Sequence, residues 1–376
     1  MSEFTALDRA FMARALTLAA NGLVSAHPNP RVGCVLVRDG QVLAEGWHER
    51  AGGPHAEAAA LANLKAQQPQ DVPEAGIAAG ATAYVTLEPC NHHGRTPPCS
   101  EALIRAGVAR VVYAIGDPNP GVKGGGAQRL REAAIQVQSG LLAVEAAELN
   151  AGFIKRMRSG MPLVRLKLAM SLDGRTALSD GRSKWITGEE ARRDVQHWRA
   201  RSGAILTGIG TVLADDPSLS VRPADPGVRQ PLRVILDSDL KLPPQSRVFE
   251  GMGAQGVWVF TASHDPLRRA ALSARGARVE HCAQGATVDL AQALAMLGKA
   301  GINEVLVEAG ATLAGALVEQ DCVDELLLYV APVVLGDRAR ALLRLPEPGT
   351  LEQARRFEVF ETVMVGADQR IRLRGG

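Results

Sequence analysis

A histidine and two cysteines that are far apart in the sequence carry the most distinctive chemistry of this chain. Cys90 and Cys99 lie in the segment EPCNHHGRTPPC, with eight residues between them, and His55 begins the alanine-rich segment HAEAAAL. Zinc favours four ligands drawn from imidazole nitrogens and thiolate sulfurs, and a catalytic zinc site keeps one of these positions for water. These three residues therefore predict a zinc site with one open position.

Glu57 lies two residues after His55, in the first turn of the helix that the segment HAEAAAL predicts. From there the carboxyl group can reach the water without being a ligand, so we expect it to act as the general acid–base. A competing interpretation is a structural zinc site in which His92 and His93 join the two cysteines. That interpretation leaves His55 and Glu57 without a role, and the catalytic one is favoured.

The spacing of the cysteines distinguishes this chain from most zinc deaminases. Their general signature is H-x-E followed by P-C-x-x-C, whereas here H-A-E is followed by P-C and a second cysteine after eight residues. With HPNPRVGCVLV at residues 27–37, this pattern resembles the deaminase half of the bifunctional riboflavin-biosynthesis deaminase/reductase family. The resemblance implies that Asn29 orients the substrate just outside the zinc shell.

The second half of the chain resembles the reductase half of the same family, so the resemblance covers about residues 4 to 370. It is carried by segments such as KLAMSLDGRTA, GRSKWITG and NEVLVEAGATLAGALVE. It implies a dihydrofolate-reductase-like fold that uses NADPH. The residues that it places at the cofactor are Ala169, Trp185, Thr211, Asp215, Ser238, Gly310, Ala311, Thr312, Leu313, Ala314, Gly315 and Ala316.

The same resemblance implies how the reductase holds its substrate. The residues concerned are Ser183, Arg199, Leu219, Arg222 and Glu308. The substrate phosphate is expected on the two arginines, because a guanidinium group makes bidentate contacts with phosphate. Lys167 is expected to polarise the sugar carbonyl or to bind the sugar hydroxyls.

From the residues alone, the nucleotide site is less distinctive. The small-residue turn at Gly310 precedes a predicted helix, and free backbone N–H groups at a helix start suit a phosphate. No G-x-G-x-x-G follows a first strand, so the Rossmann fingerprint is absent. No residue distinguishes NADPH from NADH.

Strands and helices alternate along the chain and must position these residues. Residues 4–20 have helical spacing, residues 31–49 predict a hairpin that turns at Asp39-Gly40, and one long helix is expected from Leu141 to Met157. A new series of strands follows. We expect an α/β protein with a cytidine-deaminase-like α/β/α sandwich in residues 1–150 and a dihydrofolate-reductase-like α/β domain in residues 151–376.

Composition excludes several classes of protein. The 376 residues carry a formal net charge of +2, without the basic excess that is typical of nucleic-acid-binding proteins. No run of about 18 apolar residues predicts a membrane span, and the five cysteines suggest no disulfide framework. We expect a cytoplasmic homo-oligomer that acts on a small phosphorylated pyrimidine and has no nucleic-acid or membrane partner.

The residues and the resemblance together predict one enzyme with two active sites. The first deaminates 2,5-diamino-6-(5-phosphoribosylamino)pyrimidin-4(3H)-one to 5-amino-6-(5-phosphoribosylamino)uracil, and the second reduces the ribosyl to the ribityl chain with NADPH. One alternative is a deaminase whose second domain only binds nucleotide, which the presence of Lys167, Arg199 and Asp215 disfavours. A nucleic-acid-editing deaminase needs the short C-x-x-C spacing and an aromatic groove, whereas aromatic residues are 4% of this chain.

Overall fold

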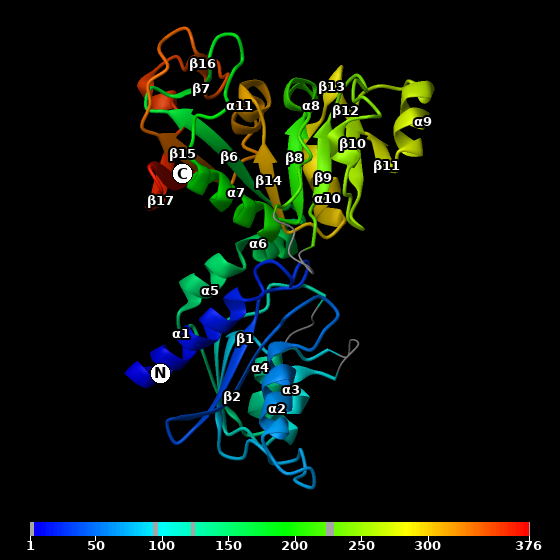
Figure 1. Ribbon diagram of the computed structural model, residues 1–376. Coiled ribbons are helices and arrows are strands. Elements are labelled where there is room, and N and C mark those ends of the chain that lie inside the picture. Colours follow the sequence, from blue (N-terminus) through cyan, green and yellow to red (C-terminus); the bar gives the residue numbers. More distant parts are fainter. Residues whose placement is uncertain (1–3, 93–96, 122–124, 223–228, 376) are drawn as a thin grey trace. The chain divides into compact units, whose positions relative to one another are not determined.

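The computed structural model describes residues 4–92, 97–121, 125–222 and 229–375. The chain forms two compact units that divide after Gly160 (Figure 1). Each unit has its own sheet and its own hydrophobic clusters. Within the described ranges, none of the helices combines the length and the apolar character needed to cross a membrane.

The first unit is a three-layer α/β/α sandwich around a five-stranded sheet of order β2-β1-β3-β4-β5. Its strands are β1 (Gly33–Arg38), β2 (Gln41–Trp47), β3 (Thr82–Leu87), β4 (Arg110–Ile115) and β5 (Gln136–Ser139). Helices α1 (Ala6–Ala20) and α5 (Ala143–Leu149) cover one face, and α2 (Ala56–Ala66), α3 (Cys99–Arg105) and α4 (Gly126–Glu132) cover the other (Figure 1).

Strand β1 shows how one sequence serves both faces of this sheet. Cys34 and Leu36 join the cluster under α2, α3 and α4, whereas Val35 and Val37 join the cluster under α1 and α5. Successive side chains of a strand point to opposite faces, so a fully apolar strand is buried on both. The expected hairpin is confirmed, and its turn residues Asp39 and Gly40 have φ of 51° and 74°.

The expectation of one helix from Leu141 to Met157 is wrong. The chain forms α5 and then α6 (Ala151–Ser159), with a break at the buried residue Asn150. The Asn150 side chain accepts from the N–H of Arg31 at 2.8 Å and donates to the carbonyl oxygen of Arg31 at 2.9 Å. The backbone of Asn150 is not helical, with φ of −114° and ψ of 17°. In this conformation its side-chain amide makes both hydrogen bonds with the backbone of Arg31.

The second unit is built on a nine-stranded sheet of order β11-β10-β9-β8-β14-β6-β15-β18-β17. Neighbouring strands run parallel from β11 to β15, and β18 and β17 are antiparallel. The strands are β6 (Leu163–Ser171), β8 (Ala204–Gly208), β9 (Leu232–Leu236), β10 (Val257–Thr261), β11 (Ala277–His281), β14 (Glu304–Glu308), β15 (Glu325–Ala331), β17 (Phe357–Val365) and β18 (Asp368–Gly375).

Helices cover both faces of this second sheet. Helices α7 (Glu189–Arg201), α8 (Ile209–Asp215) and α9 (Pro266–Ala274) pack on one face, and α10 (Leu290–Lys299) and α11 (Ala311–Glu319) pack on the other. Two small ladders and two short 3₁₀ turns complete the unit: β7 (Arg175–Ala177) with β16 (Arg340–Ala341), β12 (Ala283–Gln284) with β13 (Thr287–Val288), Arg247–Phe249 and Leu351–Gln353. The expected α/β fold class is confirmed.

Two glycines let helices approach the first sheet closely. A Cβ atom on Gly33 would lie 2.0 Å from the carbonyl oxygen of Ala15 in α1. A Cβ atom on Gly46 would lie 2.4 Å from the amide nitrogen of Ala60 and 2.6 Å from the carbonyl oxygen of Ala56, both in α2. Because the backbone of α2 rests directly on β2, Gly46 sets the position of the helix start.

We predict that Gly46→Ala lowers the free energy of unfolding of the first unit by about 1–3 kcal/mol, because the added methyl group forces backbone atoms apart. Chemical or thermal unfolding followed by circular dichroism measures this change. Gly116→Ala is the matched control, because the nearest described atom to a Cβ there is Glu88 Oε2, at an ordinary contact distance of 3.6 Å. Equal stability of the two variants would contradict the close-approach argument.

Candidate active sites

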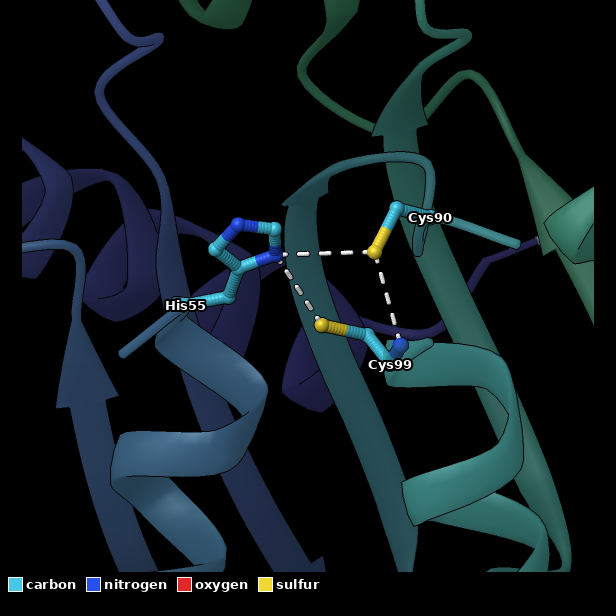
Figure 2. A group of neighbouring side chains, drawn as sticks. All are labelled: His55, Cys90 and Cys99. Atoms are coloured by element: carbon cyan, nitrogen blue, oxygen red, sulfur yellow. Dashed lines mark hydrogen bonds between the residues drawn. The ribbon is translucent and has the colours of Figure 1, made fainter. Parts of the chain in front are cut away.

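Three side chains of the first unit converge where two helices begin and one strand ends. His55 immediately precedes α2, Cys90 follows β3, and Cys99 is the first residue of α3. His55 Nδ1 lies 3.5 Å from Cys90 Sγ and 3.3 Å from Cys99 Sγ (Figure 2). Donor atoms around a tetrahedral zinc with bonds of about 2.0–2.3 Å are about 3.5 Å apart. The donor set and its spacing fit a zinc ion.

The sulfur of Cys90 is prepared to carry negative charge. Its hydrogen bond with the thiol of Cys99, and further bonds with His55 and the Cys99 backbone, lower the pKa of Cys90 against the opposing effect of burial. The backbone N–H of Cys99 donates to Cys90 Sγ at 3.4 Å (Figure 2). Since the thiolate is the form that binds metals, these contacts favour coordination.

Glu57 lies in the first turn of α2 and is buried. Burial raises the pKa of its carboxyl group to about 7. A group with a pKa near the working pH is the most effective proton carrier, because both of its protonation states are accessible. The environment of Glu57 thus suits a general acid–base.

The role of His48 was not predicted, because the sequence around it contains no motif that indicates one. Its Nδ1 lies 2.8 Å from the carbonyl oxygen of Pro54, which can only accept, so Nδ1 carries the proton. Nε2 therefore accepts from the Asn29 side-chain amide at 3.0 Å. Burial lowers the pKa of His48 and favours this neutral form. His48 is buried and orients the amide of Asn29, with its ring edge-on to that of His55.

The structural zinc site with His92 and His93 is not the arrangement that forms in the described part of the chain. There, the converging metal-ligating group contains His55 with the two cysteines, and His92 is exposed. His93 lies outside the described residues. The missing ligand therefore comes from the α2 segment.

In the second unit, parallel strands bring the expected residues to one edge of the sheet. Strands β6, β8, β9 and β14 are parallel, so their carboxyl ends share an edge, which is where ligands bind in open α/β sheets. The expected residues along this edge are Lys167 and Ala169 on β6, Thr211 and Asp215 on α8 after β8, Ser238 after β9, Glu308 at the end of β14, and Gly310 to Ala316 at the start of α11.

A buried ion pair joins Arg199 of α7 to Glu308. The Nε and Nη2 atoms of Arg199 donate to the two carboxylate oxygens at 2.6 and 2.9 Å, and Nη1 donates to the carbonyl oxygen of Ser220 at 2.9 Å. Burial alone would raise the pKa of Glu308, but the charge of Arg199 lowers it overall. Glu308 is thus a fixed carboxylate.

Lys167 lies beside this carboxylate, because β6 and β14 pair Lys167 with Glu308. Burial lowers the pKa of Lys167, and the nearby Glu308 partly offsets that effect. The Lys167 ammonium group also lies 5.7 Å from the centre of the Tyr329 ring. A buried ammonium with a lowered pKa can donate a hydrogen bond to a polar group of a ligand.

Three of the expected residues, Lys167, Trp185 and Arg222, line one cavity of about 340 Å³. The sequence analysis missed other residues of this lining. The missed polar and aromatic residues are Thr187, Arg192, Gln196 and Tyr329. Helical spacing on α7 is the signal that could have found Arg192 and Gln196, because residues three and seven positions before Arg199 share its helix face.

Other expected residues have structural contacts of their own. The side chain of Leu219 is buried in the core with Val212 and Leu240, so it can offer a ligand only its backbone. Ser238 Oγ accepts from the N–H of Val288 at 3.2 Å. The carbonyl oxygen of Ser183 accepts from the N–H of Ile186 at 3.1 Å.

The family comparisons divide the chain in the same order. Residues 5–115 match the cytidine and deoxycytidylate deaminase zinc-binding region, and residues 162–365 match the RibD C-terminal domain. Riboflavin biosynthesis protein RibD of Escherichia coli is 48% identical, covering 98% of this chain and 99% of the relative. The same protein of Haemophilus influenzae is 46% identical, covering 98% and 97%.

Solved structures agree with these sequence matches. Acinetobacter baumannii RibD, form 1, has a TM-score of 0.88 and 45% identity, covering 98% of this chain and 99% of that one. The diaminohydroxyphosphoribosylaminopyrimidine deaminase/5-amino-6-(5-phosphoribosylamino)uracil reductase of Thermotoga maritima has a TM-score of 0.86 and 33% identity, with the same coverage. The identity over nearly the full length of both chains, together with the two family matches, means that this chain belongs to the RibD family of riboflavin biosynthesis proteins.

Proposed function

We propose that the two groups of side chains carry the two activities of this bifunctional enzyme of riboflavin biosynthesis. The first unit deaminates 2,5-diamino-6-(5-phosphoribosylamino)pyrimidin-4(3H)-one to 5-amino-6-(5-phosphoribosylamino)uracil. The second unit reduces the ribosyl of that product to the ribityl chain with NADPH. The observation that carries the proposal is the convergence of His55, Cys90 and Cys99, whose donor atoms are separated by the distances expected between ligands of one zinc ion.

In the deaminase, His55, Cys90 and Cys99 hold the zinc ion. Zinc supplies a Lewis acid that lowers the pKa of a water molecule toward neutrality. Glu57 takes a proton from the attacking water and delivers it to the departing amine. Water adds to the ring carbon, ammonia leaves, and the C–NH2 group becomes C=O. The pKa of Glu57, raised to about 7 by burial, allows it to do both transfers.

Asn29 orients the pyrimidine for this attack. Its amide nitrogen is engaged by His48, which leaves the amide oxygen as the acceptor for a ring N–H or an amino group of the substrate. Since His48 is itself fixed by the carbonyl of Pro54, the Asn29 amide keeps one orientation. Asn29, held by His48, therefore favours a substrate that points an N–H donor at the amide oxygen.

In the reductase, the cofactor lies along the carboxyl edge of the sheet. Backbone N–H groups of Ala311, Thr312 and Leu313, in the first turn of α11, have no acceptor within the helix and suit the cofactor phosphates. The small residues that follow, as far as Ala316, complete this part of the cofactor site. Ala169, Trp185, Thr211, Asp215 and Ser238 complete the cofactor site. NADPH would supply the hydride to the sugar carbon, and the ammonium of Lys167 would donate a hydrogen bond to the sugar oxygen, which takes its proton from solvent.

The substrate phosphate is bound by Arg222 and Arg199 in different ways. Arg222 lines the cavity and offers its guanidinium group directly. Arg199 is held by Glu308 and by the carbonyl of Ser220, so it contributes its charge and its two remaining N–H donors. Ser183, Glu308 and the backbone of Leu219 hold the rest of the substrate.

We propose that each part of the chain carries one activity. Residues 1–150 carry the deaminase and residues 151–376 the reductase, with helix α6 packed as part of the first compact unit. The substrates are small phosphorylated pyrimidines, not nucleic acids or membranes. The net charge of +2 supports this. We further propose that the enzyme is a cytoplasmic homo-oligomer.

We predict that Cys99→Ser loses most of the zinc and the deaminase activity, because a hydroxyl group is a poor substitute for a thiolate ligand. Metal analysis, ammonia release and NADPH oxidation are measured separately on the purified protein. The reductase activity should remain. Cys322→Ser, the same exchange in the second unit, should keep its zinc. Full zinc in Cys99→Ser together with full deaminase activity would contradict the ligand assignment.

Glu57→Gln is expected to keep the zinc but to lower the deaminase kcat by roughly 10²–10⁴-fold, because the amide cannot carry the proton. The measurements are zinc content and the rate of ammonia release. Glu145→Gln is the matched control, since Glu145 is an exposed residue in the first turn of α5. Ammonia release at the parent rate by Glu57→Gln would rule out Glu57 as the proton carrier.

Arg222→Ala is expected to raise the reductase KM for the phosphorylated substrate by roughly ten- to hundredfold, because a charge-assisted hydrogen bond is lost. The dephosphorylated analogue is the control substrate and should show little change. Arg199→Ala should show a similar loss together with a lower kcat, because it also leaves Glu308 without its partner. If both variants discriminate between the two substrates as well as the parent does, the phosphate lies elsewhere.

A further inference from the structure

Trp185 is a large aromatic residue whose side chain is mostly exposed to solvent. Its exposed fraction is 68%, although it lines the cavity of the second unit. It lies in the segment that precedes α7, outside any helix or strand. An indole in such a place samples several rotamers unless another group holds it, and ordering it on ligand binding costs conformational entropy.

Arg192 makes two contacts that restrain this segment. Its guanidinium carbon lies 4.4 Å from the centre of the Trp185 ring. Its Nη1 atom donates to the carbonyl oxygen of Thr187 at 2.7 Å. A guanidinium group is planar, so it can stack on an aromatic face and still donate hydrogen bonds in its own plane.

The end of the segment is fixed independently of Arg192. The N–H of Gly188, which directly precedes α7, donates to the buried carboxylate of Asp368 at 2.7 Å. This contact anchors the helix start but does not reach the indole. The backbone of the turn is closed by the N–H of Ile186, which donates to the carbonyl oxygen of Ser183, whereas the contact of the indole ring itself is the one with Arg192.

We infer that Arg192 is a positioning residue for the reductase. It occupies one face of the Trp185 indole and leaves the other face for the flat nicotinamide ring of NADPH. This inference rests on the proposed function, which places the cofactor at Trp185. Arg192 acts through Trp185 on cofactor binding and has no part in the chemistry of hydride transfer.

Direct binding of the anionic substrate by Arg192 is the competing role, because Lys167 and Arg222 line the same cavity. The two roles differ in which KM they change. A positioning role through the indole changes the KM for NADPH and depends on the presence of Trp185. A phosphate contact changes the KM for the sugar substrate and does not depend on Trp185.

The test compares Arg192→Ala, Arg192→Lys, Trp185→Ala and the double variant in the full-length, zinc-loaded enzyme. Arg192→Ala should raise the KM for NADPH roughly two- to fivefold, the effect of one exposed cation–π contact, with kcat and ammonia release unchanged. Arg192→Lys should restore only part of the affinity, because an ammonium group cannot stack. Arg193→Ala is the matched control, since Arg193 is the next residue of α7 and pairs on the exposed surface with Glu189.

The double variant decides between the outcomes. In the Trp185→Ala background, Arg192→Ala should add no further rise in the KM for NADPH. The inference is overturned if the two effects add in full, if the sugar-substrate KM rises instead, or if only Trp185→Ala weakens NADPH binding. If Trp185→Ala itself leaves the KM for NADPH unchanged, the cofactor placement in the proposed function fails and the inference falls with it. Should Arg192→Ala prove unstable to heat, Arg192→Lys carries the same comparison.

Discussion

The deaminase site depends on one constraint, which is that a carboxyl group, an imidazole and two thiols lie together where little water reaches. Burial raises the pKa of Glu57 to about 7, and the hydrogen bond with the Cys90 side chain together with burial raises the pKa of Cys99. A buried group resists ionisation unless an opposite charge compensates it. A divalent cation held by His55, Cys90 and Cys99, as proposed, would supply that charge and allow the thiolates to form. Metal binding and the working protonation states are therefore coupled.

In the second unit, buried charged side chains form ion pairs with each other, which offsets the loss of hydration. On β6, Arg165 and Lys167 lie on the same face of the sheet. Arg165 bonds Glu304 and Glu325 at 3.0 and 2.9 Å, whereas the carboxylate beside Lys167 is that of Glu308, which is already paired with Arg199. A fully compensated cation has its donors engaged by carboxylates of the fold and offers few of them to a ligand. The less compensated Lys167 lies at the edge of the sheet where the proposed reductase site is placed, which fits its proposed role as a donor to the substrate.

Much of the local structure could be predicted from the sequence because it depends on near neighbours. The hairpin at Asp39-Gly40 and helix α2 follow from residue spacing and turn chemistry, and the zinc donors follow from a motif whose spacing is unusual. The break at Asn150 could not be predicted, because its cause is the backbone of Arg31. His48 was missed for a similar reason, since its role appears only when Asn29 and Pro54 are placed around it.

By itself, the sequence determined the class of chemistry, the two-part α/β organisation and the three side chains proposed as zinc ligands. Periodicity and motif spacing are properties of short segments, so they can be recognised without knowing the fold. Only the tertiary structure decided which charges meet: Arg199 with Glu308, Lys167 with the same carboxylate, and Arg192 with the ring of Trp185. The first pairing joins helix α7 to strand β14, the second joins the neighbouring strands β6 and β14, and the third joins α7 to the turn before it. Each depends on how side chains are placed in space, which the spacing of residues in a segment does not give.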